Sequence, residues 1–84
     1  MEIPEDIIKG CLKGDSVSQK KLYDLTAPFM YGVCLQYAGN EHDAKDILQD
    51  GFIKVYNKIN QYSSKGSMTG WIRRIMINTA LERY

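Results

Sequence analysis

The hydrophobic and polar positions of residues 43–60 repeat with the 3.6-residue period of an α-helix. One side of this predicted helix is apolar and is expected to face the core: Ala44, Leu48, Gly51, Phe52, Val55 and Ile59. The opposite side, about 180° away, carries carboxylates and amides: Asp46, Gln49, Asp50 and Asn57. Ile53 lies in the middle of that polar side. The pattern therefore predicts a buried side and a polar side that has an apolar centre.

Two interpretations of Ile53 are open. Folded proteins carry many isolated apolar groups on their surfaces, so a single exposed isoleucine need have no function. Alternatively, an apolar centre with an acidic and amide rim suits the docking of a basic or polar partner helix. The second interpretation makes the polar side of residues 43–60 a candidate binding face.

The same period predicts three further helices and no strands. The first begins near Pro4 and ends at Gly14. The second runs from a cap at Asp15 or Ser16 to about residue 37, and the last follows a cap at Ser67. The residues expected to face inward are Ile7, Ile8, Cys11 and Leu12 in the first helix, Leu22, Leu25, Phe29, Met30, Val33, Cys34 and Tyr37 in the second, and Met68, Trp71, Ile72, Ile75, Met76 and Thr79 in the last. We therefore expect an all-α fold, a compact bundle of about four helices in a single domain over residues 1–84.

Two local features shape the second helix. Pro28 lacks the N–H that would bond to the Asp24 carbonyl, so we expect either a kink or a new helix start capped by Thr26. Gly39 and Asn40 then supply the end of this helix and the N-cap of the next. Because this turn is very short, the two helices should lie antiparallel.

The charges of this 84-residue chain are unevenly distributed. The net charge is +1, but the part up to Phe52 holds nine acidic and five basic residues. From Ile53 onward there are six basic residues, and Glu82 alone is acidic. The two halves therefore suggest two partners, and the basic half is the candidate for binding a polyanion.

Several kinds of chemistry find no support in the sequence. Cys11 and Cys34 are far apart on apolar sides and predict neither a disulfide framework nor a metal site, and His42 is expected to be solvated. No catalytic motif is evident, so we predict a binding protein that is not an enzyme, with no cofactor and no metal. No secretory signal and no long apolar run occur, so we expect no membrane insertion and a reducing, cytoplasmic location.

Two motifs resemble one known family. DAKDILQDGFIKVYNKINQY resembles the core-binding helix of bacterial RNA polymerase sigma factors, whose usual form is an Asp-Ala-Glu-Asp-Leu-x-Gln-Glu-x-Phe run ending in an aromatic. SMTGWIRRIMINTA resembles the promoter-recognition helix of the extracytoplasmic-function branch of the sigma-70 type, with its Trp-aliphatic-x-Arg-Ile-x-x-Asn pattern. The resemblance covers essentially the whole chain, and the order of the two motifs makes it specific.

The resemblance implies a fold, two partners and two sets of residues. In the family this piece is the region 2 domain, a helical bundle that binds the coiled coil of the largest polymerase subunit and recognises and melts the −10 promoter element. It assigns polymerase binding to Asp46, Gln49 and Asp50, and Ile53 and Asn57 extend that face. An anti-sigma factor is a further partner that the family allows.

For promoter DNA, the resemblance points to the polar segment after residue 60 and to the last helix. The implied contacts with the non-template strand are Tyr62, Ser63, Ser64, Lys65, Arg74 and Asn78, with Lys58 and Arg73 as additional phosphate contacts. Cations neutralise phosphates, and a polar loop with an aromatic can hold an unstacked base. Tyr62 stands where the family usually has Phe, so an anchor that closes the loop onto the bundle is as good an interpretation as a stacking platform.

Departures from the family pattern and other functions complete these expectations. Asp50 stands where the family commonly has the longer Glu, and Gly51 after it lowers helix propensity by up to about 1 kcal/mol relative to Ala. Family members continue into a helix-turn-helix domain, region 4, so the resemblance predicts that this chain stops before it. The alternatives are a helical protein–protein adaptor with no nucleic-acid role and, less favoured, a stand-alone helix-turn-helix repressor.

Overall fold

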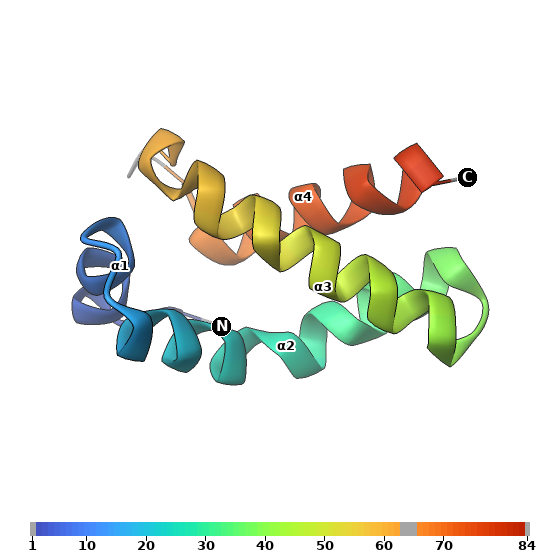
Figure 1. The fold of residues 1–84 in the computed structure, drawn as a ribbon, viewed down its shortest axis with the longest axis horizontal. Coiled ribbons are helices and arrows are strands. Elements are labelled where there is room, and N and C mark those ends of the chain that lie inside the picture. The colour runs from blue at the N-terminus through green and yellow to red at the C-terminus, as the bar shows by residue number, and fades with distance from the viewer. Residues whose placement is uncertain (1, 63–65, 84) are drawn as a thin grey trace.

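The structure, a computed structural model, describes residues 2–62 and 66–83. These residues form α1 (Glu5–Leu12), α2 (Ser16–Ala38), α3 (Glu41–Lys58), the short 3₁₀ helix η1 (Ile59–Gln61) and α4 (Met68–Arg83) (Figure 1). No strand occurs among the described residues, and the bundle measures 34 × 22 × 22 Å. The predicted all-α bundle is confirmed.

Polar side chains begin the helices where the sequence predicted caps. The Asp15 carboxylate accepts the Ser18 N–H at 3.1 Å, and the Asn40 side chain accepts the Asp43 N–H at 2.8 Å. Ser67 accepts the Gly70 N–H at 3.2 Å at the start of α4. These contacts satisfy amide donors that a helix start leaves without partners. Asp15, rather than Ser16, is therefore the cap of α2.

The three long helices enclose one core. α2, α3 and α4 each contact the other two, and α1 packs against α2 and η1. In Figure 1, α2 and α3 run beside each other, joined by the short turn at residues 39–40. The largest fully buried side chains are Leu22, Met30, Ile47, Ile72 and Met76. All six predicted inward residues of 43–60 are buried, five of them in α3 and Ile59 in η1, and Ile47 joins them.

The inward side of α2 differs from the prediction. Leu25, Phe29 and Tyr37 were expected in the core, but they are 38%, 47% and 42% exposed. The buried side is turned instead toward Thr26 and Ala27. Of the two alternatives at Pro28, the helix restart capped by Thr26 is wrong, because α2 continues through Pro28 and the Thr26 hydroxyl donates to the Leu22 carbonyl at 2.8 Å within the helix.

Gly51 brings α3 and α4 close together. The glycine is buried, and a Cβ placed on it would overlap Sδ and Cε of Met76 in α4. Met76 is itself completely buried, so the sulfur fills the space that any larger residue would need. The glycine that weakens α3 as a helix therefore serves the contact between helices.

Candidate functional site

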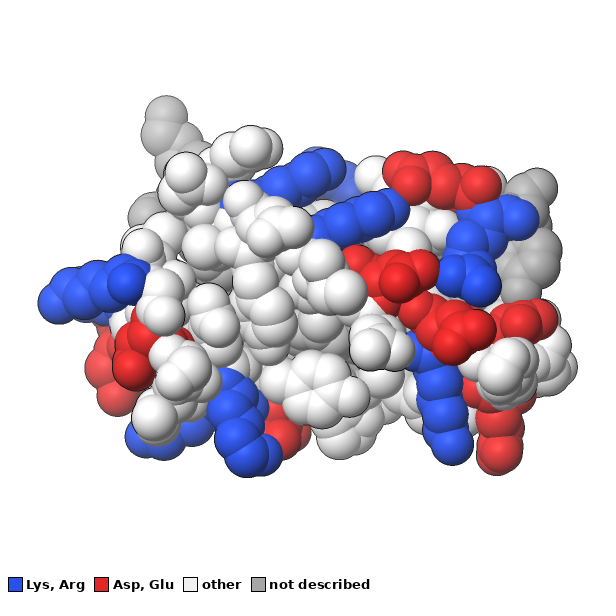
Figure 2. All heavy atoms as spheres, in the orientation of Figure 1, with Lys and Arg blue, Asp and Glu red and all other residues white. Residues whose placement is uncertain are grey.

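The polar face of α3, which we define as Asp46, Gln49, Asp50, Ile53 and Asn57, lies on the outside of the bundle. Four of its members are exposed and Asp46 is half-buried. Ile53 is 54% exposed, although the other side of the same helix is buried. Figure 2 shows a broad uncharged area in the middle of this side of the molecule, with acidic and basic side chains toward both ends. The predicted exposure of this face is confirmed.

Arg83, in the last turn of α4, lies against this face. Its Nη1 donates to Oδ2 of Asp50 at 2.8 Å, and its Nη2 lies 3.7 Å from Oδ2 of Asp46. A second contact joins the same two helices, because Lys54 Nζ lies 2.8 Å from Oε2 of Glu82. The hydrogen bond and charge of Lys54 lower the pKa of Glu82. The acidic part of the polar face therefore already holds one cation from within the chain.

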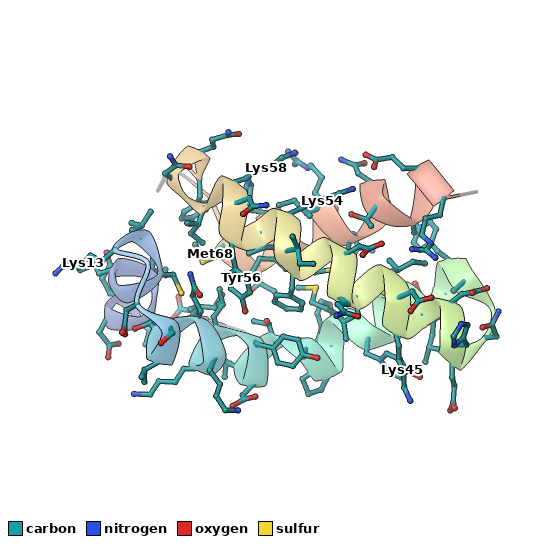
Figure 3. All side chains as sticks on the ribbon, viewed as in Figure 1. Lys13, Lys45, Lys54, Tyr56, Lys58 and Met68 are labelled. Carbon is teal, nitrogen blue, oxygen red and sulfur yellow. The ribbon has the colours of Figure 1, made fainter. Side chains whose placement is uncertain are left out.

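An aromatic groove beside the polar face was missed by sequence reasoning. It has a volume of about 640 Å³ and is lined by Tyr23, Tyr31, Lys45, Leu48, Gln49, Phe52, Ile53 and Tyr56. The Tyr23 and Phe52 rings are 4.8 Å apart between centroids, and the Tyr56 hydroxyl donates to the Gln19 carbonyl at 2.9 Å. Figure 3 shows Tyr56 pointing from α3 toward α2, with Lys54 and Lys58 on the opposite side of α3.

One sequence signal could have indicated this groove. Phe52 and Tyr56 are four residues apart and so lie on neighbouring turns of the same helix side. Two large rings on the edge of an apolar stripe are too bulky for a single partner helix to cover both of them. Aromatic side chains in a hollow are frequent at binding surfaces. Since Gln49 and Ile53 line the groove and also belong to the polar face, the two surfaces are continuous.

The candidate DNA residues of α4 lie on its outer side. Arg73, Arg74 and Asn78 are exposed, as is Lys58 near the end of α3. Ser63, Ser64 and Lys65, the centre of the predicted DNA loop, lie outside the described residues. The cations and the amide of the last helix are therefore on the surface of the bundle.

Tyr62 and Trp71 form the wall of a small cavity at the start of α4. Their ring centroids are 5.6 Å apart, and the Tyr62 hydroxyl donates to the Gly66 carbonyl. This bond spans residues 63–65, so of the two interpretations of Tyr62 it favours the anchor. Trp71 was expected in the core but is only half-buried, because it lines this cavity of about 360 Å³ together with Arg74.

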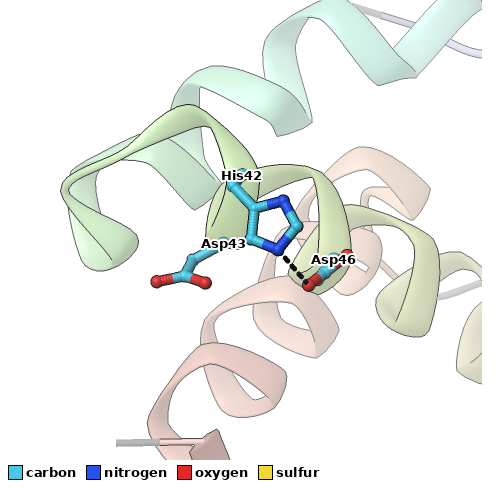
Figure 4. A group of neighbouring side chains, drawn as sticks. All are labelled: His42, Asp43 and Asp46. Atoms are coloured by element: carbon cyan, nitrogen blue, oxygen red, sulfur yellow. Dashed lines mark ion pairs between the residues drawn. The ribbon is translucent and has the colours of Figure 1, made fainter.

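One group of side chains has the composition of a metal site. The ligand atoms of His42, Asp43 and Asp46 lie within 4.8 Å of one another (Figure 4). However, His42 is exposed, Asp43 is tied to the Asn40 cap, and Asp46 pairs with both His42 and Arg83 at 3.7 Å. Residues of this kind at a helix start are explained by capping and by the helix dipole.

The two cysteines are buried in the core. Cys11 and Cys34 are both free thiols. Burial raises the pKa of Cys34 to about 11, and burial followed by the nearby Asp15 charge raises that of Cys11. A thiol with a raised pKa is a weak nucleophile at neutral pH.

In the described part of the chain no helix is long and apolar enough to cross a membrane.

Comparisons with known proteins agree with these features. The chain is 32% identical over 76 residues to the ECF RNA polymerase sigma factor SigW of Bacillus subtilis, which covers 90% of this chain and 41% of that protein. It is 36% identical over 53 residues to the ECF RNA polymerase sigma factor SigE of Mycolicibacterium smegmatis, which covers 63% of this chain and 20% of the relative. It is also 25% identical over 83 residues to the RNA polymerase sigma-H factor of Pseudomonas aeruginosa, with 94% and 41% covered. The chain thus spans less than half the length of each.

Residues 22–84, which include α3, α4 and most of α2, match the family described as Sigma-70 region 2. The relatives named as ECF factors agree with the branch that the α4 motif indicated. The chain therefore belongs to the Sigma-70 region 2 family and resembles its extracytoplasmic-function branch, as the motifs of its third and fourth helices predicted.

Proposed function

We propose that this chain is the part of a transcription initiation factor that docks on core RNA polymerase and binds the −10 promoter element as an opened strand. The observation that carries the proposal is the presence of two exposed surfaces of opposite character on neighbouring helices. The polar face of α3 is acidic around Ile53, and the outer side of α4 carries Arg73, Arg74 and Asn78. A protein that joins a polymerase to DNA needs both kinds of surface.

The polar face supports polymerase binding by its chemistry. Asp46 and Asp50 attract cations, Gln49 and Asn57 supply hydrogen bonds, and Ile53 supplies apolar area that water leaves on docking. The adjoining aromatic groove would extend this contact, because buried aromatic side chains contribute strongly to interfaces. The expected partner surface is the coiled coil of the largest subunit, presenting a cation and an apolar side chain.

The outer side of α4 supports binding to a single strand. Arg73, Arg74 and Lys58 are exposed cations that suit phosphates in either form of DNA. Preference for the opened form must come from groups that contact an unstacked base. The cavity beside Trp71 and Arg74 offers an aromatic ring and a guanidinium, and the Asn78 amide can pair with a base edge. Melting is then favoured because the open strand is held better than the duplex.

Titration of the chain with matched single-stranded and duplex −10 oligonucleotides, with and without core polymerase, tests the DNA half. We expect weak binding by the chain alone, a preference for the single strand with polymerase present, and a loss of that preference in Asn78→Ala. Gln36→Ala is the matched control, because it removes an exposed amide from α2 and belongs to neither proposed surface. Equal affinity for both forms, unchanged by Asn78→Ala with polymerase present, would leave only a nonspecific basic patch.

Charge reversal at Asp50 tests the polymerase half. Asp50→Lys should weaken binding to core polymerase strongly, since it replaces attraction by repulsion at the rim of the interface. Asp6→Lys is the control, because Asp6 is an exposed carboxylate on α1, which packs against α2 and η1. Equal losses in both variants would indicate a general charge effect and would contradict the assignment.

A helical adaptor without a nucleic-acid role is the second candidate function. The aromatic groove favours it, because an apolar hollow next to an acidic face suits a protein partner and does not require DNA. The titration above separates the two functions. An adaptor would bind its protein partner through α3 and show no salt-sensitive binding to single-stranded DNA.

A further inference from the structure

Arg83 differs from the other arginines of α4 in the direction it faces. It follows Arg74 by nine positions, which at about 100° per residue places the two on opposite sides of the helix. Arg73 and Arg74 are exposed on the candidate DNA surface, whereas Arg83 reaches α3 and bridges Asp50 and Asp46. Arg83 therefore contacts the polar face of α3 and lies apart from the candidate DNA surface.

We propose that Arg83 is an internal counter-ion that occupies the cation site of the polymerase-binding face and competes with the cationic side chain of the partner. The inference rests on the proposed function of that face. The Arg83 guanidinium lies at hydrogen-bond distance from the Asp50 carboxylate and 3.7 Å from that of Asp46, one helical turn away on α3. An arginine or lysine of the polymerase that approaches Asp50 or Asp46 meets a site that is already occupied.

The occupied site is also easy to open. The side chains of Arg83, Asp46 and Asp50 are 36%, 43% and 49% exposed, so water screens their attraction. Ion pairs with this exposure contribute at most about 1 kcal/mol, which limits the competition to about fivefold in affinity. Arg83 therefore weakens docking modestly. It also favours a partner whose cation makes a better bidentate contact with these carboxylates than Arg83 does.

The charge around the face points in the same direction. With Arg83 in place, one cation faces the two carboxylates, so part of their negative charge remains. Lys54 lies nearby, but Glu82 already pairs with it at 2.8 Å. Removing the Arg83 charge therefore leaves the two carboxylates with no intramolecular arginine, and it strengthens their attraction for a cationic partner over the range of a Debye length.

The test measures binding of the whole chain to core RNA polymerase at low and at moderate salt, with four variants. Arg83→Gln removes the charge, and Arg83→Lys keeps it. Glu82→Gln is the matched control, since it breaks the neighbouring α3–α4 ion pair without touching the carboxylates. Asp50→Asn reports whether the face binds polymerase at all.

We expect Arg83→Gln to bind polymerase about two- to fivefold more tightly at low salt, with a smaller gain at higher salt. Arg83→Lys should stay near the original affinity, and Glu82→Gln should give no gain. Equal or weaker binding by Arg83→Gln, while Asp50→Asn still weakens binding, would overturn the counter-ion role alone. No effect of Asp50→Asn would refute the proposed function of the face.

Discussion

Replacing Gly51 by alanine tests how closely α3 and α4 pack, and two opposing effects decide the result. Alanine raises helix propensity, which stabilises the fold by up to about 1 kcal/mol. Its Cβ, however, would overlap Sδ and Cε of Met76. Because Met76 is completely buried, its side chain cannot move aside into solvent. Overpacking of a core costs about 1–3 kcal/mol. We expect the steric cost to win, so that Gly51→Ala lowers the free energy of unfolding by about 1 kcal/mol.

The Met76→Ala background should reverse the sign of this effect. Met76→Ala alone should cost about 2–5 kcal/mol, because it leaves a cavity in the core. It also removes the sulfur and methyl that the new Cβ would meet, while the nearest backbone atom, Met76 Cα, lies at an ordinary 3.8 Å. In that background the added methyl gains helix propensity and fills part of the cavity. Gly51→Ala should therefore stabilise the Met76→Ala variant by up to about 1 kcal/mol.

Urea unfolding of the four proteins of this double-mutant cycle, followed by circular dichroism, gives the coupling free energy. We expect a coupling of about 1–3 kcal/mol between the two positions, as for residues in contact. In a domain of this size, 1 kcal/mol also shifts the thermal midpoint by about 4–8 °C. If Gly51→Ala stabilises both backgrounds equally, the two positions are not in contact and the glycine is only a weak point of α3.

Three further results are expected. Trp71→Ala should lower the free energy of unfolding by about 2–3 kcal/mol, less than for a fully buried tryptophan, because Trp71 is half-buried against Tyr62. A loss of single-strand binding with unchanged stability would instead indicate that Trp71 contacts the bases. Ile53→Ser should leave stability within about 0.5 kcal/mol and weaken polymerase binding, since this side chain is 54% exposed; unchanged affinity would return it to the ordinary surface. The free energy of unfolding should fall as pH rises from 9 toward 11, because the pKa of Cys34 is raised from 9.0 to about 11 in the folded chain and the unfolded thiol loses its proton first. Cys34→Ala should reduce this pH dependence. An equal slope of unfolding free energy against pH in both proteins would contradict the prediction.

Local signals predicted most of the fold because they act over one or two helical turns. The caps at Asp15, Asn40 and Ser67 and the buried stripe of α3 depend on residues three or four apart. The exposure of Leu25 and Phe29 could not be predicted in this way. α2 contacts α1, α3 and α4, so which part of its wide apolar side is covered depends on where those helices lie.

The candidate site shows the same division. The exposed polar face of α3 followed from the period of one helix, and Ile53 identified its centre. The contact between Asp50 and Arg83 joins residues 33 positions apart, and nothing in either local pattern points to it. The aromatic groove also depends on tertiary structure, because Tyr23 and Tyr31 come from α2 and meet Phe52 and Tyr56 of α3 only after packing.

The Arg83 contact also limits how strongly polymerase docking can influence DNA binding within this chain. A ligand shifts an equilibrium only by its difference in affinity for the two states, and the effect is reciprocal between the two ligands. Releasing Arg83 frees its exposed contacts with Asp46 and Asp50, worth at most about 1 kcal/mol, on the side of α4 opposite Arg74. The close contact of Gly51 with Met76 would remain and hold the two helices together. If the proposed function holds, polymerase can therefore change single-strand affinity by no more than about fivefold through Arg83, and a larger effect must come by another route.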